Sequence, residues 1–143
     1  MVTYVVVDGA NVVGSRPDGW WRDRAGAAAR LAERLDAALR DDPAALAAAV
    51  GAVGSPGDLH VPLVLEGAAR RAEPRVSDPR LEIVDAPADG DSTIAELARD
   101  LTGRGDDVVV VTADRGLRDR IRAAGARAVG PGALLRALPA TVH

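Results

Sequence analysis

The chain has 143 residues, of which 48% are hydrophobic and 27% are charged, and it has no cysteine. This length suits one domain with a core that needs no covalent or metal staple, so we expect a single domain over residues 1–143. The lack of cysteine excludes a disulfide framework, thiolate zinc sites and a catalytic thiol. No apolar run reaches the roughly 20 residues of a membrane helix and the first residues do not form a signal peptide, so we expect a cytoplasmic protein without a membrane partner.

The charged residues are unusual in kind rather than in balance. All 18 basic residues are arginine and 21 residues are acidic, which gives a formal net charge of −3. A catalytic lysine and a phosphate-loop lysine are therefore excluded. The near-neutral balance argues against a protein that coats nucleic acid nonspecifically. Any phosphate contact from a basic side chain must come from a planar guanidinium.

The first 50 residues predict a strand followed by two helices. Val5–Val7 is short, apolar and β-branched, which is typical of a buried strand. Over residues 23–41 the apolar side chains recur with a helical period and share one face: Ala28, Leu31, Ala32, Leu35 and Leu39. Charged residues lie off that face: Arg30, Arg34, Asp36 and Arg40. Pro43 interrupts this helix, and residues 44–50 predict a further short one.

The middle of the chain predicts two more strands and a helix. Gly54–Asp58 is a turn cluster, and the apolar runs Val61–Leu65 and Leu81–Val84 predict strands. Asp91 is expected to open a helix that ends at Gly103. The apolar stripe of this helix is Ile94, Leu97, Ala98 and Leu101.

The last third predicts a strand at Val108–Thr112 and a short fifth strand at Arg127–Val129. Two helices are indicated by their apolar stripes, Leu117, Ile121 and Ala124 before Gly125, and Leu134, Leu135 and Leu138 near the end. Continuous apolar strands separated by helices indicate a parallel sheet that is covered on both faces. We therefore predict an α/β protein, a three-layer α/β/α sandwich with a central, mainly parallel sheet of about four or five strands.

An acidic residue follows each well-defined predicted strand. Asp8 follows the first strand, Glu66 the second, Asp85 the third with Asp91 a little further on, and Asp114 the fourth. Because the carboxyl ends of parallel strands meet at one edge of a sheet, these acids are expected to lie there together. Crowded carboxylates repel one another unless a cation lies among them, and sets of oxygen ligands suit Mg²⁺ or Mn²⁺. The pattern therefore predicts a divalent-metal site.

Each acid also has a structural explanation. Asp91 and Asp114 are well placed as helix N-caps, and Asp8 could start an Asx-turn. Asp85 and Asp89 would then be solvated loop acids. Caps do not require an acid at the end of nearly every strand, which favours a shared site.

Several other kinds of active site fail on spacing. A haloacid-dehalogenase-type phosphatase needs a second aspartate where this chain has Ala10. No Gly-rich dinucleotide loop and no nucleophile elbow occur. His60 and His143 are the two histidines, and neither suits a catalytic triad. His60 is expected to be structural.

Three blocks of sequence carry a resemblance to a known family. They are Val6–Asn11 at the first strand, Asp91–Ile94 at the middle helix, and Val111–Arg118 after the fourth strand. In this order and spacing they resemble the NYN branch of the PIN-domain superfamily, and in particular the small bacterial YacP-like endoribonucleases. The resemblance extends from about residue 3 to about residue 137.

The resemblance implies a PIN-like fold and a ribonuclease that depends on Mg²⁺ or Mn²⁺ and leaves a 5′-phosphate and a 3′-hydroxyl. By position, Asp8, Asp91 and Asp114 would be the acids that hold the metal. Asn11 would orient the first acid or the substrate phosphate, and Thr112 would support the third acid by hydrogen bonding.

Two further metal candidates depart from the family pattern. Asp119 lies five residues past Asp114, so helical geometry turns it partly away. Glu66 stands where relatives often place aspartate, and its longer side chain would reach a metal through water. These departures leave open whether the site holds one metal ion or two.

Contacts to RNA are expected from side chains near the same edge. The candidate arginines flank the loop after the first strand and follow the second and fourth strands: Arg16, Arg22, Arg24, Arg70, Arg71, Arg115 and Arg118. Arg118 could instead form a helical ion pair with Asp114. Trp20 and Trp21 could stack on bases, or cover the sheet edge or the first long helix.

Three other functions stay open beside a ribonuclease. The first is an inactive PIN-like protein that binds RNA or the ribosome, although three mutually repelling carboxylates argue against a retired site. The second is the toxin of a toxin–antitoxin pair, and the third is a small-molecule phosphohydrolase of similar topology. The sequence predicts no particular oligomeric state.

Overall fold

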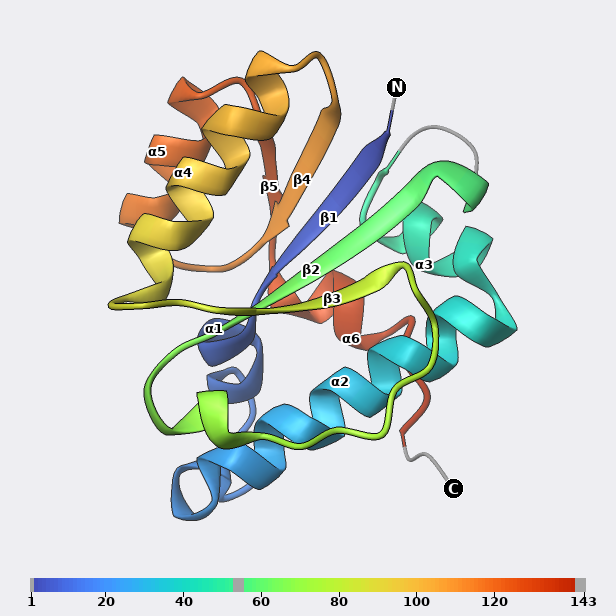
Figure 1. The fold of residues 1–143 in the computed structure, drawn as a ribbon, viewed down its shortest axis with the longest axis vertical. Coiled ribbons are helices and arrows are strands. Elements are labelled where there is room, and N and C mark those ends of the chain that lie inside the picture. The colour runs from blue at the N-terminus through green and yellow to red at the C-terminus, as the bar shows by residue number, and fades with distance from the viewer. Residues whose placement is uncertain (1, 53–55, 141–143) are drawn as a thin grey trace.

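The computed structural model describes residues 2–52 and 56–140. Its strands form one five-stranded sheet in the order β3-β2-β1-β4-β5, with every neighbouring pair parallel (Figure 1). The strands are β1 (Thr3–Asp8), β2 (Leu59–Leu65), β3 (Leu81–Asp85), β4 (Asp107–Val111) and β5 (Arg127–Val129). The α-helices are α1 (Gly9–Gly14), α2 (Arg24–Asp41), α3 (Pro43–Ala49), α4 (Gly90–Gly103), α5 (Arg115–Ala123) and α6 (Pro131–Leu135). The described 3₁₀ helices are η1 (Trp20–Arg22), η2 (Pro56–Asp58) and η3 (Gly67–Arg71).

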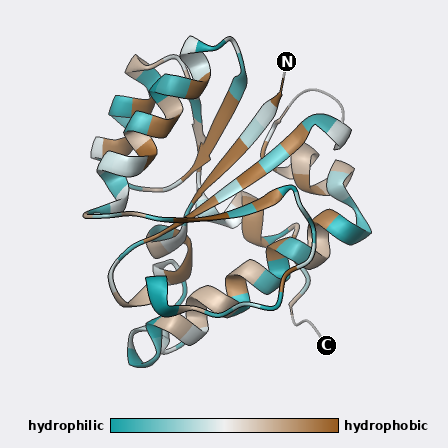
Figure 2. Cartoon of the chain, in the orientation of Figure 1, coloured by the Kyte–Doolittle hydropathy of each residue, from teal (hydrophilic) through white to brown (hydrophobic). Residues whose placement is uncertain are grey.

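Helices cover both faces of this sheet. α4 and α5 lie on one face, and α1, α2, α3 and α6 lie on the other (Figure 1). Successive strand residues point to opposite faces, so Val5 and Val7 pack beneath α2 while Val6 packs beneath α4. Figure 2 shows hydrophobic residues running along the strands between the polar outer surfaces of the helices. The predicted three-layer α/β/α sandwich with a parallel sheet is confirmed.

The strand order decides where a site can form. The chain runs outward from β1 to β2 and β3, and then returns to β4 on the other side of β1. The segments that follow β1 and β4 lead to helices on opposite faces, so the carboxyl ends of these two strands form the switch point of the sheet, where proteins of this class bind ligands. Asp8 ends β1 and Thr112 directly follows β4, so both residues lie at this switch point.

The long helix agrees with its predicted pattern. α2 begins after Asp23, whose carboxylate caps the helix by accepting a hydrogen bond from the backbone N–H of Gly26 at 2.9 Å. The predicted apolar face is buried in the core: Ala28, Leu31, Ala32, Leu35 and Leu39. Asp42 caps α3 in the same way, and Pro43 occupies the first position of that helix, where its missing N–H has no cost.

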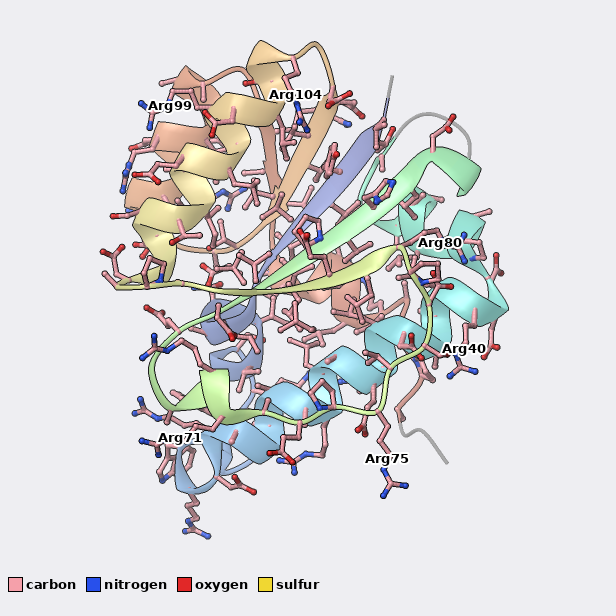
Figure 3. The ribbon with its side chains drawn as sticks, in the orientation of Figure 1. Arg40, Arg71, Arg75, Arg80, Arg99 and Arg104 are labelled. Atoms are coloured by element: carbon pink, nitrogen blue, oxygen red, sulfur yellow. The ribbon has the colours of Figure 1, made fainter. Side chains whose placement is uncertain are left out.

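One charged residue of α2 contradicts the prediction. Asp36 does not lie on an outer face, because it is 2% exposed and accepts hydrogen bonds from the backbone N–H groups of Ser77 at 2.9 Å and Asp78 at 2.7 Å. Burial would raise the pKa of Asp36, but these bonds and the guanidinium of Arg40 outweigh it and hold the pKa below its ordinary value. Figure 3 shows Arg40 and Arg80 near the C-terminal end of α2. Asp36 therefore ties the segment before β3 to α2.

The segment after β1 also differs from the prediction, which placed a loop there. Asp8 is both the last residue of β1 and the N-cap of α1, so the helix begins with no intervening loop. A Cβ atom on Gly9 would lie 2.6 Å from the backbone oxygen of Val64, so only glycine fits this close approach to β2. The sequence pattern did not indicate α1 because the valines of this segment favour strands.

The other predicted helices and strands are confirmed, with small shifts at their ends. α6 ends at Leu135, and Leu138 lies beyond it, although it is buried. Of the expected turn cluster, Pro56–Asp58 forms η2, while Gly54 and Ser55 lie outside the described residues. His60 stacks on Tyr4 with 5.6 Å between ring centroids, which is a structural role. Within the described parts of the chain, no helix is long and apolar enough to cross a membrane.

Candidate active site

Asp8 is buried at the switch point between β1 and β4. Its side chain is held by the backbone N–H of Asn11 at 3.3 Å and by the hydroxyl of Thr112 at 2.9 Å. Only 4% of the residue is exposed. The pKa of Asp8 is raised to about 6: burial is the main cause and the charges of Asp91 and Glu66 add to it, while the two hydrogen bonds act in the opposite direction.

Two polar side chains lock the end of β1 to the segment after β4. The hydroxyl of Thr112, which is fully buried, donates to Asp8 and accepts from the backbone N–H of Asp114 at 3.2 Å. The side-chain oxygen of Asn11 accepts from the backbone N–H of Ala113 at 2.8 Å. Asn11 and Thr112 therefore fix the spacing between Asp8 and Asp114.

Asp114 has the capping role that its position allows. Its carboxylate accepts from the backbone N–H of Leu117 at 2.8 Å and so caps α5. The residue is exposed, and its second oxygen makes no hydrogen bond with the described residues. A carboxylate that caps with one oxygen keeps the other available to a ligand.

The prediction that Asp91 caps the middle helix is wrong. α4 begins at Gly90, and its cap is Asp89, which accepts from the backbone N–H of Ser92 at 2.7 Å. Asp89 is therefore a cap and not only a solvated loop acid. Asp91 lies in the first turn, half-buried, and its carboxylate makes no hydrogen bond with the described residues.

Electrostatics place Asp91 among the other acids. Burial raises the pKa of Asp91, and the charges of Asp114, Glu66 and Asp89 raise it further, against a smaller lowering by Arg120. Glu66 follows β2 and accepts from the backbone N–H of Gly90 at 2.8 Å, which links the end of β2 to the start of α4.

We call the four interacting acids the acid cluster: Asp8, Glu66, Asp91 and Asp114. They come from four separate segments, and the charges of Glu66, Asp91 and Asp114 each raise the pKa of another member. Their carboxylate oxygens and mutual repulsion are of the kind that Mg²⁺ or Mn²⁺ would relieve, so the donor chemistry fits a divalent cation. Within residues 2–52 and 56–140, however, no three His, Cys, Asp or Glu side chains are gathered closely enough to hold one ion.

Asp119 is not brought into the acid cluster. It lies on the exposed side of α5, in a shallow cavity that is otherwise lined by Arg115, Arg118 and Arg122.

The alternative helical ion pair between Arg118 and Asp114 is absent among the described residues, because the carboxylate of Asp114 turns to the helix N-terminus. The Nε atom of Arg118 is buried without a hydrogen-bond partner among those residues.

Two other candidate arginines, Arg70 and Arg16, lie in different surroundings. Arg70 donates to the backbone oxygens of Gly67 and Ala86, so it bridges η3 and the segment between β3 and α4 at the edge where the acids lie. Arg16 lies instead in a cavity between α1 and α2 that contains no member of the acid cluster. Arg16 follows the end of α1 that is remote from Asp8, in a cavity whose lining includes none of these acids.

The two tryptophans have different surroundings. Trp20 is half-buried and lines a cavity of about 400 Å³ together with Glu66 and Asp89. The guanidinium of Arg24 lies 5.4 Å from the ring centroid of Trp20. Trp21 is 53% exposed and does not line this cavity.

The parallel α/β/α sandwich is consistent with the PIN-like fold expected from the sequence. The chain is similar to a solved point mutant of Rae1 (YacP) from Bacillus subtilis, with a TM-score of 0.60, 20% identity, and coverage of 94% of this chain and 74% of that one. A second structure of Rae1 (YacP) gives a TM-score of 0.58 at 20% identity, with 93% and 71% covered. No family model and no curated protein matches the sequence. The likeness shows the fold, and that fold is the one expected from the three YacP-like sequence blocks.

Proposed function

We propose that this protein is a metal-dependent ribonuclease, and specifically an endoribonuclease, that hydrolyses phosphodiester bonds of RNA at the acid cluster. The observation that supports it most is electrostatic. Four segments bring mutually repelling carboxylates to one edge of the sheet, and two of these acids, Asp8 and Asp91, have raised pKa values. The likeness to the fold of Rae1 (YacP) agrees with this proposal.

The residues of the acid cluster would hold Mg²⁺ or Mn²⁺. When bound, the cation would supply a water molecule of lowered pKa and would offset the charge that develops on the phosphate. Thr112 and Asn11 would keep Asp8 and Asp114 at a fixed spacing through the hydrogen bonds they make. Neither of these two side chains needs to titrate for this role.

The RNA backbone would be bound by arginines around the cluster. Arg70 lies beside the segment that leads to Asp91, and Arg115 and Arg118 lie in the first turns of the helix that Asp114 caps. Guanidinium groups at these places would contact phosphates next to the cleaved bond and position the strand.

A substrate panel tests the proposal. RNA, single-stranded DNA, flap DNA and nucleotides would each be incubated with the protein in Mn²⁺, in Mg²⁺ and in a chelator. We expect cleavage of RNA in either metal and none in the chelator. Intact RNA under every condition, with a folded protein, would contradict it.

One observation favours a second function, an inactive protein that binds RNA or the ribosome. No three acids of the described residues lie within reach of one ion. In that case the same panel would show RNA binding in gel-shift measurements with no products in any metal. Such a result would replace the first proposal with the second.

The variants Asp114→Asn and Asp114→Ala separate the metal role from the capping role. Asparagine caps a helix as well as aspartate does, whereas alanine costs about 1 kcal/mol. We expect both variants to lose cleavage more than about 100-fold, while thermal unfolding in a chelator shows only the alanine variant to be destabilised. Full activity in the asparagine variant would show that capping is the whole role of this residue.

Trp20 and Trp21 provide a matched pair for a role in binding bases. Stacking on one base contributes about 1–3 kcal/mol, so Trp20→Ala should raise the KM for single-stranded RNA about tenfold with little change in kcat. Trp20→Phe should recover most of the loss, and Trp21→Ala should stay within about twofold of the wild type. Steady-state kinetics give both constants. Equal effects at the two positions would contradict a specific role for the Trp20 cavity.

A further inference from the structure

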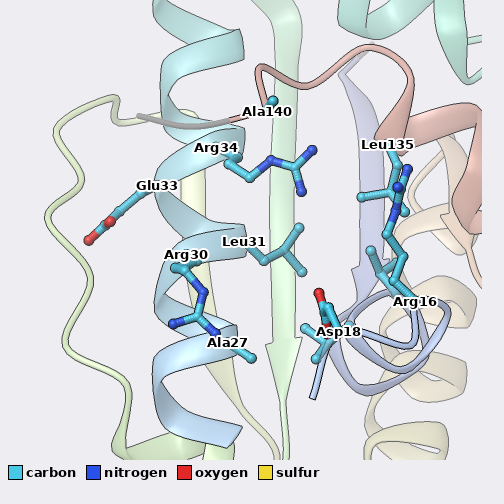
Figure 4. Close-up of a pocket in the computed structure, with 11 residues that line it drawn as sticks. Arg16, Asp18, Ala27, Arg30, Leu31, Glu33, Arg34, Leu135 and Ala140 are labelled. Carbon is cyan, nitrogen blue, oxygen red and sulfur yellow. The ribbon is translucent and has the colours of Figure 1, made fainter. Parts of the chain in front are cut away.

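The cavity that Arg16 lines has a volume of about 290 Å³ and lies between α1, α2 and α6. Its floor is apolar, with the buried side chains of Val12, Leu31 and Leu135. Three arginines line it: Arg16, Arg30 and Arg34. Figure 4 shows Arg34 extending from α2 into this space and Arg16 rising along the opposite wall. We call it the arginine cavity.

The positive charge of the arginine cavity is not balanced by its own lining. None of its three arginines forms an ion pair with a described residue. Glu33 also borders the cavity, but Figure 4 shows it pointing away, and its carboxylate accepts from the backbone N–H of Arg75 at 3.0 Å. Asp18 is then the one carboxylate of the described lining that faces these guanidinium groups.

Arg34 is held in an orientation that suits a ligand. Its Nε donates to the backbone oxygen of Pro139 at 2.6 Å, and its two terminal nitrogens make no hydrogen bond with described residues. Burial lowers the pKa of Arg34 and the nearby charge of Arg16 lowers it further, against a smaller opposite effect of Asp18. An anion between the two guanidinium groups would relieve this repulsion, and an apolar floor strengthens such an interaction.

We propose that the arginine cavity is a phosphate-binding site in which Arg16 and Arg34 hold the anion. A planar guanidinium with free terminal N–H groups matches the oxygens of a phosphate through paired hydrogen bonds. α1 leads from Asp8 to just before Arg16, and its six residues span about 9 Å. One RNA strand could therefore reach both the acid cluster and this cavity. The inference that RNA supplies the phosphate rests on the proposed function. The inference that the cavity binds a phosphate does not.

Binding without metal tests the site independently of cleavage. Inorganic phosphate and a short single-stranded RNA would be titrated in a chelator, by calorimetry and by tryptophan fluorescence, against the wild type, Arg16→Gln and Arg34→Lys. Arg99→Gln is the matched control, because it removes the same charge from α4 on the opposite layer (Figure 3). Thermal unfolding shows whether each variant is folded. This control matters most for Arg34, whose side chain donates a hydrogen bond to Pro139, whereas Arg16 makes no hydrogen bond with described residues.

We expect saturable phosphate binding that weakens about tenfold or more in both cavity variants and is unchanged in the control. RNA affinity should fall in parallel, and the slope of log affinity against log salt should become shallower by about 0.7 for each RNA phosphate that is no longer neutralised. If the two cavity variants weaken the binding of inorganic phosphate but not that of RNA, the ligand is free phosphate, and the inference that RNA supplies it is wrong. If neither ligand depends on them, or if Arg99→Gln weakens binding equally, the site is wrong, whether or not the protein cleaves RNA.

Discussion

In metal-free buffer at neutral pH, Asp8→Asn is expected to be more stable than the wild type, although its RNA cleavage falls more than about 100-fold. The cause is the environment of the carboxyl. Burial, with the charges of Asp91 and Glu66, raises the pKa of Asp8 from 3.8 to about 6 despite two hydrogen bonds that lower it. An asparagine side chain keeps an acceptor for the N–H of Asn11 and carries no charge.

The sign of the pH dependence follows from this raised pKa. The folded protein binds the Asp8 proton more tightly than the unfolded chain does, so ionisation of Asp8 destabilises the fold as the pH rises from about 4 to about 6. A pKa shift of this size corresponds to a decrease in the free energy of unfolding on the order of 3 kcal/mol. The asparagine variant has no such loss.

Urea unfolding between pH 4 and pH 8 in a chelator measures this difference directly. The free energy of unfolding of the wild type should fall relative to that of Asp8→Asn across the lower half of this range and then stay level. Parallel curves for the two proteins would mean that Asp8 is not strained by its neighbours, and the electrostatic argument for a cation would fail.

The largest loss of stability is expected at Asp36, far from the acid cluster. Asp36→Ala leaves the backbone N–H groups of Ser77 and Asp78 and the guanidinium of Arg40 without their acceptor. We expect a loss of about 3 kcal/mol or more at neutral pH, because a buried charged acceptor is removed from several donors. Asp41→Ala, on the exposed end of the same helix, should stay within about 0.5 kcal/mol of the wild type.

The pH dependence at Asp36 has the opposite sign to that at Asp8. The pKa of Asp36 is held below its ordinary value, so its stabilising effect is present above about pH 4 and is lost as the pH falls through the lowered pKa. The difference between the wild type and Asp36→Ala should therefore shrink below about pH 4. A difference that stays constant down to the lowest pH would show that packing, and not the carboxylate, is responsible. Chemical denaturation at several pH values supplies the curves.

The fold could be predicted because its signals are local. Apolar runs such as Val108–Thr112 and the helical stripe over residues 23–41 each indicate one element, and parallel strands then bring their ends to one edge. The neighbourhood of Asp8, Asp91 and Asp114 at that edge follows from topology alone. No distance or coordination number follows from it.

The errors concern contacts that local patterns do not contain. Asp89 rather than Asp91 caps α4, because two acids two positions apart compete for the same helix start and only the backbone conformation decides between them. Asp36 looked like a surface charge, since its partners lie 41 and 42 residues away. Arg16 and Arg34 come together only because α1 and α2 pack against each other.

Crystals soaked in Mn²⁺ provide the most direct test of the central claim, that carboxylates from separate segments gather around a cation. We expect anomalous density at the carboxyl ends of β1 and β4, with the side chains of Asp8, Asp91 and Asp114 turned toward it. The claim would be contradicted if no manganese density appeared there at a saturating Mn²⁺ concentration and the carboxylates stayed apart.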